Sequence, residues 1–267
     1  MTPISPGRSR AATLAGAVCV LLVTGMTLTG CSEEVDPNEG TNGVGKLSAA
    51  EIQNRTRTAA KSVDTVRLHG NVVTSGRTYT LDMRLKPEGG IGSVTAGGQT
   101  FRLLKVDDEL FLKADAKFWG QANGGAGKDG AKGEGEGEDD GGGASDAAAA
   151  GKLAEKYVKV PEGDPSYKKF IGFADKDVLL NSLLTLHGTL ATDGHHEQGG
   201  VRSIRITGDK GSGGTLDVSL AGKPYPLRLV RAGKAGTLSF SAWGADFALE
   251  KPAKDETLDY GGQLPTS

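Results

Sequence analysis

The chain has 267 residues, of which 24% are charged and 37% hydrophobic, a formal net charge of −2 and two cysteines. This charge balance argues against a nucleic-acid binder, which would carry a basic patch or stripe. The two cysteines argue against a disulfide-rich scaffold.

The N-terminal 30 residues have the features of a bacterial lipoprotein signal peptide. Arg8 and Arg10 form a short basic segment at the N-terminus. Residues 11–27 are apolar or small, and this run is too short to span a membrane comfortably as a permanent helix. The following LTGC sequence, which ends at Cys31, resembles the lipobox read by lipoprotein signal peptidase. Cleavage before a diacylglyceryl Cys31 would anchor the chain to the cell membrane on its extracytoplasmic face. A plain signal peptide or an uncleaved anchor is the alternative.

Cleavage at this position defines a mature chain of 237 residues that carries 29 Lys and Arg against 33 Asp and Glu, a net charge of −4. Cys19 is lost with the signal peptide. Acylation of Cys31 therefore leaves neither a free thiol nor a disulfide. We expect the mature chain, predicted to be a monomer, to be stabilised by its core alone.

Two segments of the mature chain have the composition of irregular structure. Residues 31–46 lack hydrophobic periodicity and are predicted to be a flexible tether. Residues 121–151 contain eleven glycines, seven acidic residues and two lysines, and are predicted to be a disordered acidic insert within a domain of residues 47–255. Low-affinity counterion binding is the most that such an insert supports. Residues 256–267 are predicted to be a frayed tail.

Between these segments the sequence predicts helices and many short strands. Ser48 and Glu51 form a capping box, which places a helix at residues 48–63. Asp164-Pro165 begins a second helix, and the leucine-rich residues 175–186 form a third. Alternating apolar and polar residues between turn signals indicate strands at residues 66–72, 79–85, 91–96, 100–106, 109–114, 156–161, 187–199, 203–207, 216–220, 227–229, 238–242 and 247–249.

This pattern predicts an α+β fold: a strongly curved antiparallel β-sheet, or half-barrel, of about ten strands wrapped around two or three helices. Ten strands make a sheet about 48 Å wide, because neighbouring strands lie about 4.8 Å apart. Three helices, each about 10 Å across, cover about 30 Å of it. The sheet must therefore curl strongly, be covered by loops, or leave an apolar pocket open.

The inward-facing apolar residues are both the predicted core and the candidate lining of such a cavity. They are Leu68, Val72, Leu81, Met83, Leu85, Leu179, Leu183, Ile204, Ile206, Leu216, Val218, Leu227, Leu229, Leu238 and Phe240. Trp119 and Trp243 each precede a glycine at the end of a strand region. They either anchor the rim of the core or contact ligand at a pocket mouth, because indole suits a boundary between apolar and wet surroundings.

The sequence offers little for catalysis or metal binding, so we expect no catalytic residues, no metal and no cofactor. It contains no Gly-x-Ser-x-Gly elbow, phosphate loop or dinucleotide fingerprint. His195 and His196 are the centre of one cluster of ligand-type side chains, in the sequence DGHHEQGG. Adjacent residues of a strand point to opposite faces, so an exposed polar hairpin is the stronger interpretation.

The ordered series of motifs resembles bacterial envelope lipoproteins of the LppX/LprAFG type. The resemblance rests on the lipobox, the first helix, VRLHGNV, FRLLKVDDELFLKADAKFWG, KYVKVP, the leucine-rich helix, GKPYPLRLV and LSFSAWG, and it covers residues 46–255 apart from the insert. It implies a half-barrel related in shape to the LolA and LolB carriers, with a cavity for the acyl chains of a lipid or lipoglycan that is carried across the envelope. The alternative is a surface interaction or sensor lipoprotein with a filled core.

Overall fold

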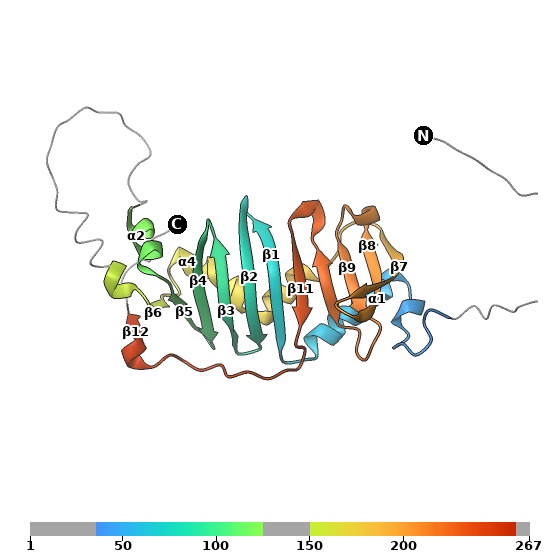
Figure 1. Cartoon of the computed structure of the whole chain (residues 1–267), viewed down its shortest axis with the longest axis horizontal. Helices are drawn as coiled ribbons and strands as arrows, with labels where there is room; N and C mark the ends of the chain where they lie inside the picture. Colours follow the sequence, from blue (N-terminus) through green and yellow to red (C-terminus); the bar gives the residue numbers. More distant parts are fainter. Residues whose placement is uncertain (1–35, 125–149, 260–267) are drawn as a thin grey trace, which may run out of the picture. The chain divides into compact units, whose positions relative to one another are not determined.

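The computed structural model describes residues 36–124 and 150–259. The predicted signal peptide, Cys31 and most of the acidic insert lie outside these residues. In the described part, helices pack against a single sheet of twelve strands (Figure 1). The strands are β1 (Val66–Thr74), β2 (Arg77–Lys86), β3 (Gly89–Ala96), β4 (Gln99–Val106), β5 (Glu109–Lys113), β6 (Tyr157–Val160), β7 (Leu190–Gln198), β8 (Val201–Gly208), β9 (Thr215–Ser219), β10 (Pro226–Val230), β11 (Gly236–Ser241) and β12 (Thr257–Asp259).

The strand order is β12-β6-β5-β4-β3-β2-β1-β11-β10-β9-β8-β7. Two meanders, β1 to β6 and β7 to β11, join where β1 pairs with β11 in the register Leu68↔Phe240. The sheet is curved and unclosed, with β12 and β7 at its edges. The predicted α+β half-barrel is therefore confirmed, with twelve strands instead of about ten.

The C-terminal segment differs most from the predicted elements. Residues 247–249, predicted to be a strand, have no regular structure. The chain instead leaves β11, in the middle of the sheet, and runs along the ends of the strands to the edge next to β6 (Figure 1). There, residues 257–259 of the predicted frayed tail form β12, which pairs in parallel with β6. Backbone pairing with β6 thus orders a segment whose own sequence carries only a weak strand signal.

The predicted helices begin at their expected caps. In α1 (Ala49–Lys61), the Ser48 Oγ accepts from the Glu51 amide, and the Glu51 carboxylate accepts from the Ser48 amide at 3.1 Å. Asp164 accepts from the Ser166 amide at 2.7 Å and caps α4 (Pro165–Ala174). The third helix is α5 (Lys176–Leu183). A further helix, α2 (Ala116–Gly124), replaces the predicted end of a strand region.

Two of the three predicted helices cover different parts of the sheet, and the third, α5, contacts both of them. Helix α1 contacts β7, β8 and α5, whereas α4 contacts β2, β3 and β4. The apolar faces of sheet and helices form one continuous core. Each fully buried leucine in it contributes about 1.5–3 kcal/mol relative to an exposed one, which makes this core the main source of stability.

Fourteen of the fifteen residues predicted to face inward belong to that core, with exposed fractions of 6% or less. The exception is Leu227, which is half-buried and outside it. The register between β10 and β9 shifts between Pro226 and Arg228. Leu227 is the extra residue of this bulge, so it loses its place in the inward-facing alternation.

Residues 37–46 of the predicted tether pack against the domain. Val44, which begins a 3₁₀ turn (Val44–Lys46), is 2% exposed in the core. The Asn42 amide donates to the Leu220 carbonyl at 2.9 Å, and its side chain donates to the Ser219 carbonyl. In the other direction, the Arg202 guanidinium of β8 donates to the Pro37 and Glu39 carbonyls of the predicted tether. We name residues 37–46 the N-terminal strap; its burial corrects the prediction that residues 31–46 form one flexible tether.

A second, smaller apolar cluster is formed by Leu104, Val106 and Phe111, with Leu249 packed against it from the C-terminal segment. Glu109 accepts from Lys159 and pairs with Lys251, which also belongs to that segment. Apolar packing and ion pairs therefore both hold the C-terminal segment against the sheet.

Within the described ranges, no helix is long and apolar enough to cross a membrane.

Candidate functional site

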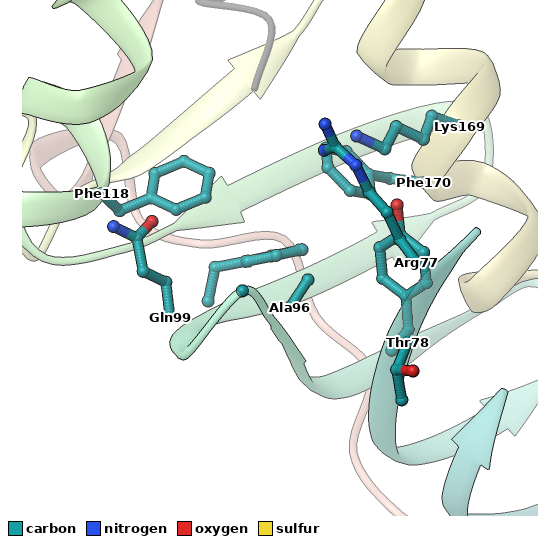
Figure 2. A pocket seen from close by; sticks show the side chains of 10 residues that line it. Arg77, Thr78, Ala96, Gln99, Phe118, Lys169 and Phe170 are labelled. Carbon is teal, nitrogen blue, oxygen red and sulfur yellow. The ribbon is translucent and has the colours of Figure 1, made fainter. Parts of the chain in front are cut away.

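A pocket of about 430 Å³ opens where β2, β3 and β4 meet α2 and α4 (Figure 2). Four aromatic side chains form its apolar wall: Tyr79, Phe101, Phe118 and Phe170. The remaining lining residues are Arg77, Thr78, Ala96, Gly97, Gln99 and Lys169. Pockets for small molecules usually measure about 300–1,000 Å³ and combine an apolar lining with a few polar groups, and this pocket has both features.

The strand register explains why the sheet side of the pocket has this shape. Tyr79 pairs with Ala96, and Ala96 pairs with Gln99, so these three side chains form one row across the inner face. The small side chain of Ala96 between two larger ones leaves a depression. Gly97 follows with φ +58, and a Cβ added there would have no atom within 4 Å. The β3–β4 turn therefore leaves open space at this end of the sheet.

The two helices supply the opposite wall. Asp115 accepts from the Phe118 amide at 2.8 Å and stabilises the first turn of α2, which carries Phe118. The Phe101 ring lies 5.3 Å from that of Phe118 and 5.0 Å from that of Phe170, measured between centroids. Such tilted and edge-on pairs contribute about 0.5–1.5 kcal/mol beyond their burial. These contacts join the three phenylalanine rings into one apolar wall.

The mouth of the pocket is lined by polar and basic side chains. Arg77 follows the β1–β2 turn, in which Ser75 and Gly76 both have positive φ, as in the tight turns that favour hairpins. Lys169 extends from α4, and its Nζ lies 5.2 Å from the centroid of the Phe170 ring. Figure 2 shows Arg77 and Lys169 on the side of the pocket next to Phe170, with Gln99 and Phe118 across from them.

None of the fifteen predicted cavity residues is among those lining this pocket. They fill the core instead, and two of them, Leu183 and Leu229, also border a smaller space of about 180 Å³. Sequence reasoning missed the aromatic lining because the inward-facing aliphatic residues, which gave the predicted lining, lie mostly along the middle of the strands. The signal that could have found it is the aromatic residue next to each turn, as in Tyr79 and Phe101.

Neither tryptophan lies at the rim of this pocket. Trp119 is 1% exposed behind Phe118, with its ring perpendicular to that ring at 5.1 Å. Its position in a helix, where a strand end was expected, turns it inward. Trp243 stacks on Tyr225 at 4.8 Å and donates to the Pro226 carbonyl. It thus packs beside the bulged β10, in the other meander.

The two adjacent histidines have separate partners. The His195 ring is 3.1 Å from the Asn38 side-chain oxygen, and the His196 ring is 2.9 Å from the Asp193 carbonyl. His195 therefore contacts the N-terminal strap, whereas His196 stays within its own hairpin. No three His, Cys, Asp or Glu side chains of residues 36–124 and 150–259 come together as metal ligands would.

The fold defines a class: a curved, unclosed, largely antiparallel sheet with helices packed against it, the fold that LprF also has. LprF from Mycobacterium bovis is similar with a TM-score of 0.50 and 15% identity, over 77% of this chain and 97% of that one. The lipoprotein LppX from Mycobacterium tuberculosis is similar with a TM-score of 0.41 and 15% identity, over 76% of this chain and 100% of that one. An uncharacterized conserved protein from Thermus thermophilus is similar with a TM-score of 0.34 and 12% identity, over 79% of this chain and 98% of that one.

No family model and no curated protein sequence matches the chain. The fold therefore rests on structural similarity to LprF at an identity too low to carry function across.

Proposed function

We propose that the chain is a membrane-anchored extracytoplasmic lipoprotein that binds an acyl chain of a lipid or lipoglycan in the aromatic pocket. The observation that carries the proposal is the aromatic-lined pocket of about 430 Å³ in a fold shared with LprF. Four aromatic rings provide an apolar surface for a chain, and the mouth provides polar groups for a head. We assign the protein no catalytic role. Carriage of the bound lipid across the envelope is the further step that this proposal suggests.

The size of the pocket limits what enters it. About 430 Å³ lies toward the lower end of the range for small-molecule sites. The sheet interior elsewhere is occupied by side chains such as Leu81, Met83 and Leu216, each 0% exposed. We therefore propose that one chain enters the pocket and that the rest of a larger lipid stays outside it.

A filling substitution tests this proposal without truncating the core. Ala96 lies between Tyr79 and Gln99 on the inner face, so Ala96→Phe should occupy the depression. Thr95→Phe adds the same ring one residue earlier, on the opposite face, and is the matched control. We expect Ala96→Phe to abolish binding of cis-parinaric acid, measured by its fluorescence, and Thr95→Phe to retain it. Equal binding by both variants would contradict the assignment of the pocket.

The anchor is proposed from the lipobox, and the strap limits its reach. If residues 31–36 are a free chain, as their composition predicts, their r.m.s. span is about 13 Å, compared with about 20 Å for fifteen residues. Because the strap packs at the β8–β9 end, that end of the domain is the one held near the membrane. Cys31→Ser should release the protein from the membrane fraction while its circular dichroism spectrum stays unchanged. Unaltered membrane fractionation would refute the anchor.

The packed interior favours one alternative, a surface interaction or sensor lipoprotein with a filled core. Fourteen of the fifteen candidate lining residues are packed in that core. Native mass spectrometry of the protein after gentle purification separates the two functions. A co-purified amphiphile supports lipid binding, whereas its repeated absence, together with no binding of fluorescent fatty acids, supports the filled scaffold.

A further inference from the structure

The N-terminal strap determines which end of the domain lies near its point of attachment. Asn42 donates to the Ser219 carbonyl at the end of β9, and Arg202 donates to the Pro37 carbonyl. Cys31 precedes Pro37 by six residues, a stretch that spans at most about 22 Å when fully extended. If Cys31 carries the anchor, as proposed above, this end of the domain therefore stays within about 22 Å of the membrane interface.

The β9–β10 loop, residues 220–225, lies at this end and is held in one conformation. Ala221 and Lys223 are exposed on it. The Ser219 hydroxyl donates to the Ala221 carbonyl at 2.8 Å and accepts from the Ala221 amide at 3.1 Å, and the Ser219 amide donates to the Tyr225 carbonyl at 2.9 Å. Because these bonds already order the loop, a partner that contacts it has little ordering entropy to offset.

A stacked aromatic pair lies beside the exposed part of this loop. The rings of Tyr225, at the end of the loop, and Trp243, which follows β11, are 4.8 Å apart between centroids, with 8° between their planes. Both residues are half-buried, so part of each side chain faces solvent. The Trp243 Nε1 donates to the Pro226 carbonyl at 3.2 Å, which satisfies its polar edge. Rings with an apolar body and a polar edge favour the boundary between hydrocarbon and water.

We propose that the anchored domain docks on the membrane surface through Lys223 and the Tyr225–Trp243 pair. This inference rests on the proposed anchor at Cys31 and adds the surface that meets the bilayer. Lys223 lies among anionic head groups, and the two rings enter the head-group layer. The tether makes a weak contact effective, because it holds the loop at a high local concentration of lipid. Without the anchor the domain dissociates, since one cation and two partly exposed rings bind a bilayer only weakly.

Docking at this end turns the aromatic pocket away from the bilayer. Neighbouring strands from β9 to β2 are antiparallel, so the end of β9 and the start of β2 lie at opposite ends of the sheet. The pocket opens at the start of β2, whereas the docking loop follows the end of β9. Four strands also separate β3, which lines the pocket, from β9. The docked domain thus faces its pocket away from the lipids of its own membrane.

The test anchors the protein chemically and follows Trp243. The unacylated mature chain has Cys31 as its only cysteine, so its thiol can be coupled to a maleimide lipid in vesicles of phosphatidylcholine and phosphatidylglycerol. Brominated phosphatidylcholine in these vesicles should quench the fluorescence of Trp243, and Trp243→Phe should abolish the quenching. The second tryptophan, Trp119, is 1% exposed in the core. Quenching that persists in Trp243→Phe would come from Trp119 and would overturn the docking assignment.

Substitutions in the loop test its role directly. Lys223→Glu should lower the ratio of docked to undocked protein at least about five-fold, the effect of one basic residue near an anionic surface. Lys234→Glu makes the same change in the exposed turn between β10 and β11, at the other end of these strands, and should leave the ratio unchanged. Ala221→Leu should raise the ratio at least about four-fold, the effect of burying one methylene group. Equal losses in the two lysine variants would overturn the proposal, because the attraction would then depend on net charge alone.

Failure of docking is distinguishable from failure of the proposed function. Because the maleimide lipid replaces the acyl anchor, the quenching experiment does not depend on processing in the cell. Absence of Trp243 quenching in the coupled chain would refute docking while leaving the anchor and the pocket intact. Unaltered membrane fractionation of Cys31→Ser would refute the anchor, and absence of fatty-acid binding would refute the lipid-binding function.

Discussion

Loss of the Arg202 side chain should increase the open population of the N-terminal strap without unfolding the domain. Its guanidinium donates to the Pro37 and Glu39 carbonyls. These bonds are charge-assisted, but the residue is exposed and solvent replaces part of what is lost, so we expect Arg202→Ala to lower the free energy of strap opening by about 1 kcal/mol. That corresponds to roughly a five-fold larger open population.

The remaining contacts of the strap determine how far it opens. Asn42 still bonds to Ser219 and Leu220, and Val44 stays buried at 2% exposed. The burial of one valine contributes about 1.5–3 kcal/mol, which exceeds the expected loss. The open state should therefore remain a minor population.

Hydrogen exchange followed by mass spectrometry of strap peptides measures this equilibrium. In Arg202→Ala, exchange of the Asn42 amide should accelerate about five-fold, while peptides from β8 and β9 keep their protection. Arg228→Ala, on the neighbouring β10, is the control and should leave strap exchange unchanged. Unaltered exchange of the Asn42 amide in Arg202→Ala would refute the role given to Arg202. Loss of protection throughout β8 would show that Arg202 supports the sheet instead.

Two further predictions concern the sheet. Lys159 and Lys251 lower the pKa of Glu109 from its ordinary 4.5 to about 2, so ionised Glu109 stabilises the fold above pH 4.5 and this contribution is lost as the pH falls from 4.5 to about 2. The fall in Tm over that range should be shallower in Glu109→Gln than in Glu88→Gln, an exposed control on the β2–β3 turn; parallel curves would contradict the ion-pair argument. At Gly70, φ is +139 and an added Cβ would lie 2.2 Å from the Thr237 carbonyl oxygen, whereas at Gly76, with φ +71, it would meet no atom within 4 Å. Gly70→Ala should therefore cost at least about 2 kcal/mol more than Gly76→Ala in urea unfolding, and equal costs would refute the close approach of β1 to β11.

The pocket and the filled core both follow from how the helices are distributed. A comparison of widths predicts that three helices cannot cover a sheet of ten strands. The uncovered apolar face must then curl, be covered by loops or line a pocket. The structure combines them: α1, α4 and α5 are placed along a curved sheet, and a pocket remains where the ends of β2 to β4 meet α4 and α2. The remaining apolar face is packed by its own side chains.

The sequence by itself determined the local elements and the side of the sheet that faces inward. The capping box at Ser48, the Asp164 cap and the alternation along the strands are signals within a few residues, because hydrogen bonding at a helix start and side-chain direction in a strand are local properties. They place α1, α4 and most strands within a few residues of where the structure has them.

Only the tertiary structure decided which elements meet. The pairing of β1 with β11, the parallel addition of β12 and the packing of the strap join residues far apart in the chain. The same is true of the pocket, whose rings come from β2, β4, α2 and α4. No local pattern encodes such contacts, and none encodes the bulge at Leu227 that turns this side chain out of the core. The residues that line a cavity and those that fill a core are equally apolar, so their three-dimensional arrangement alone separates them.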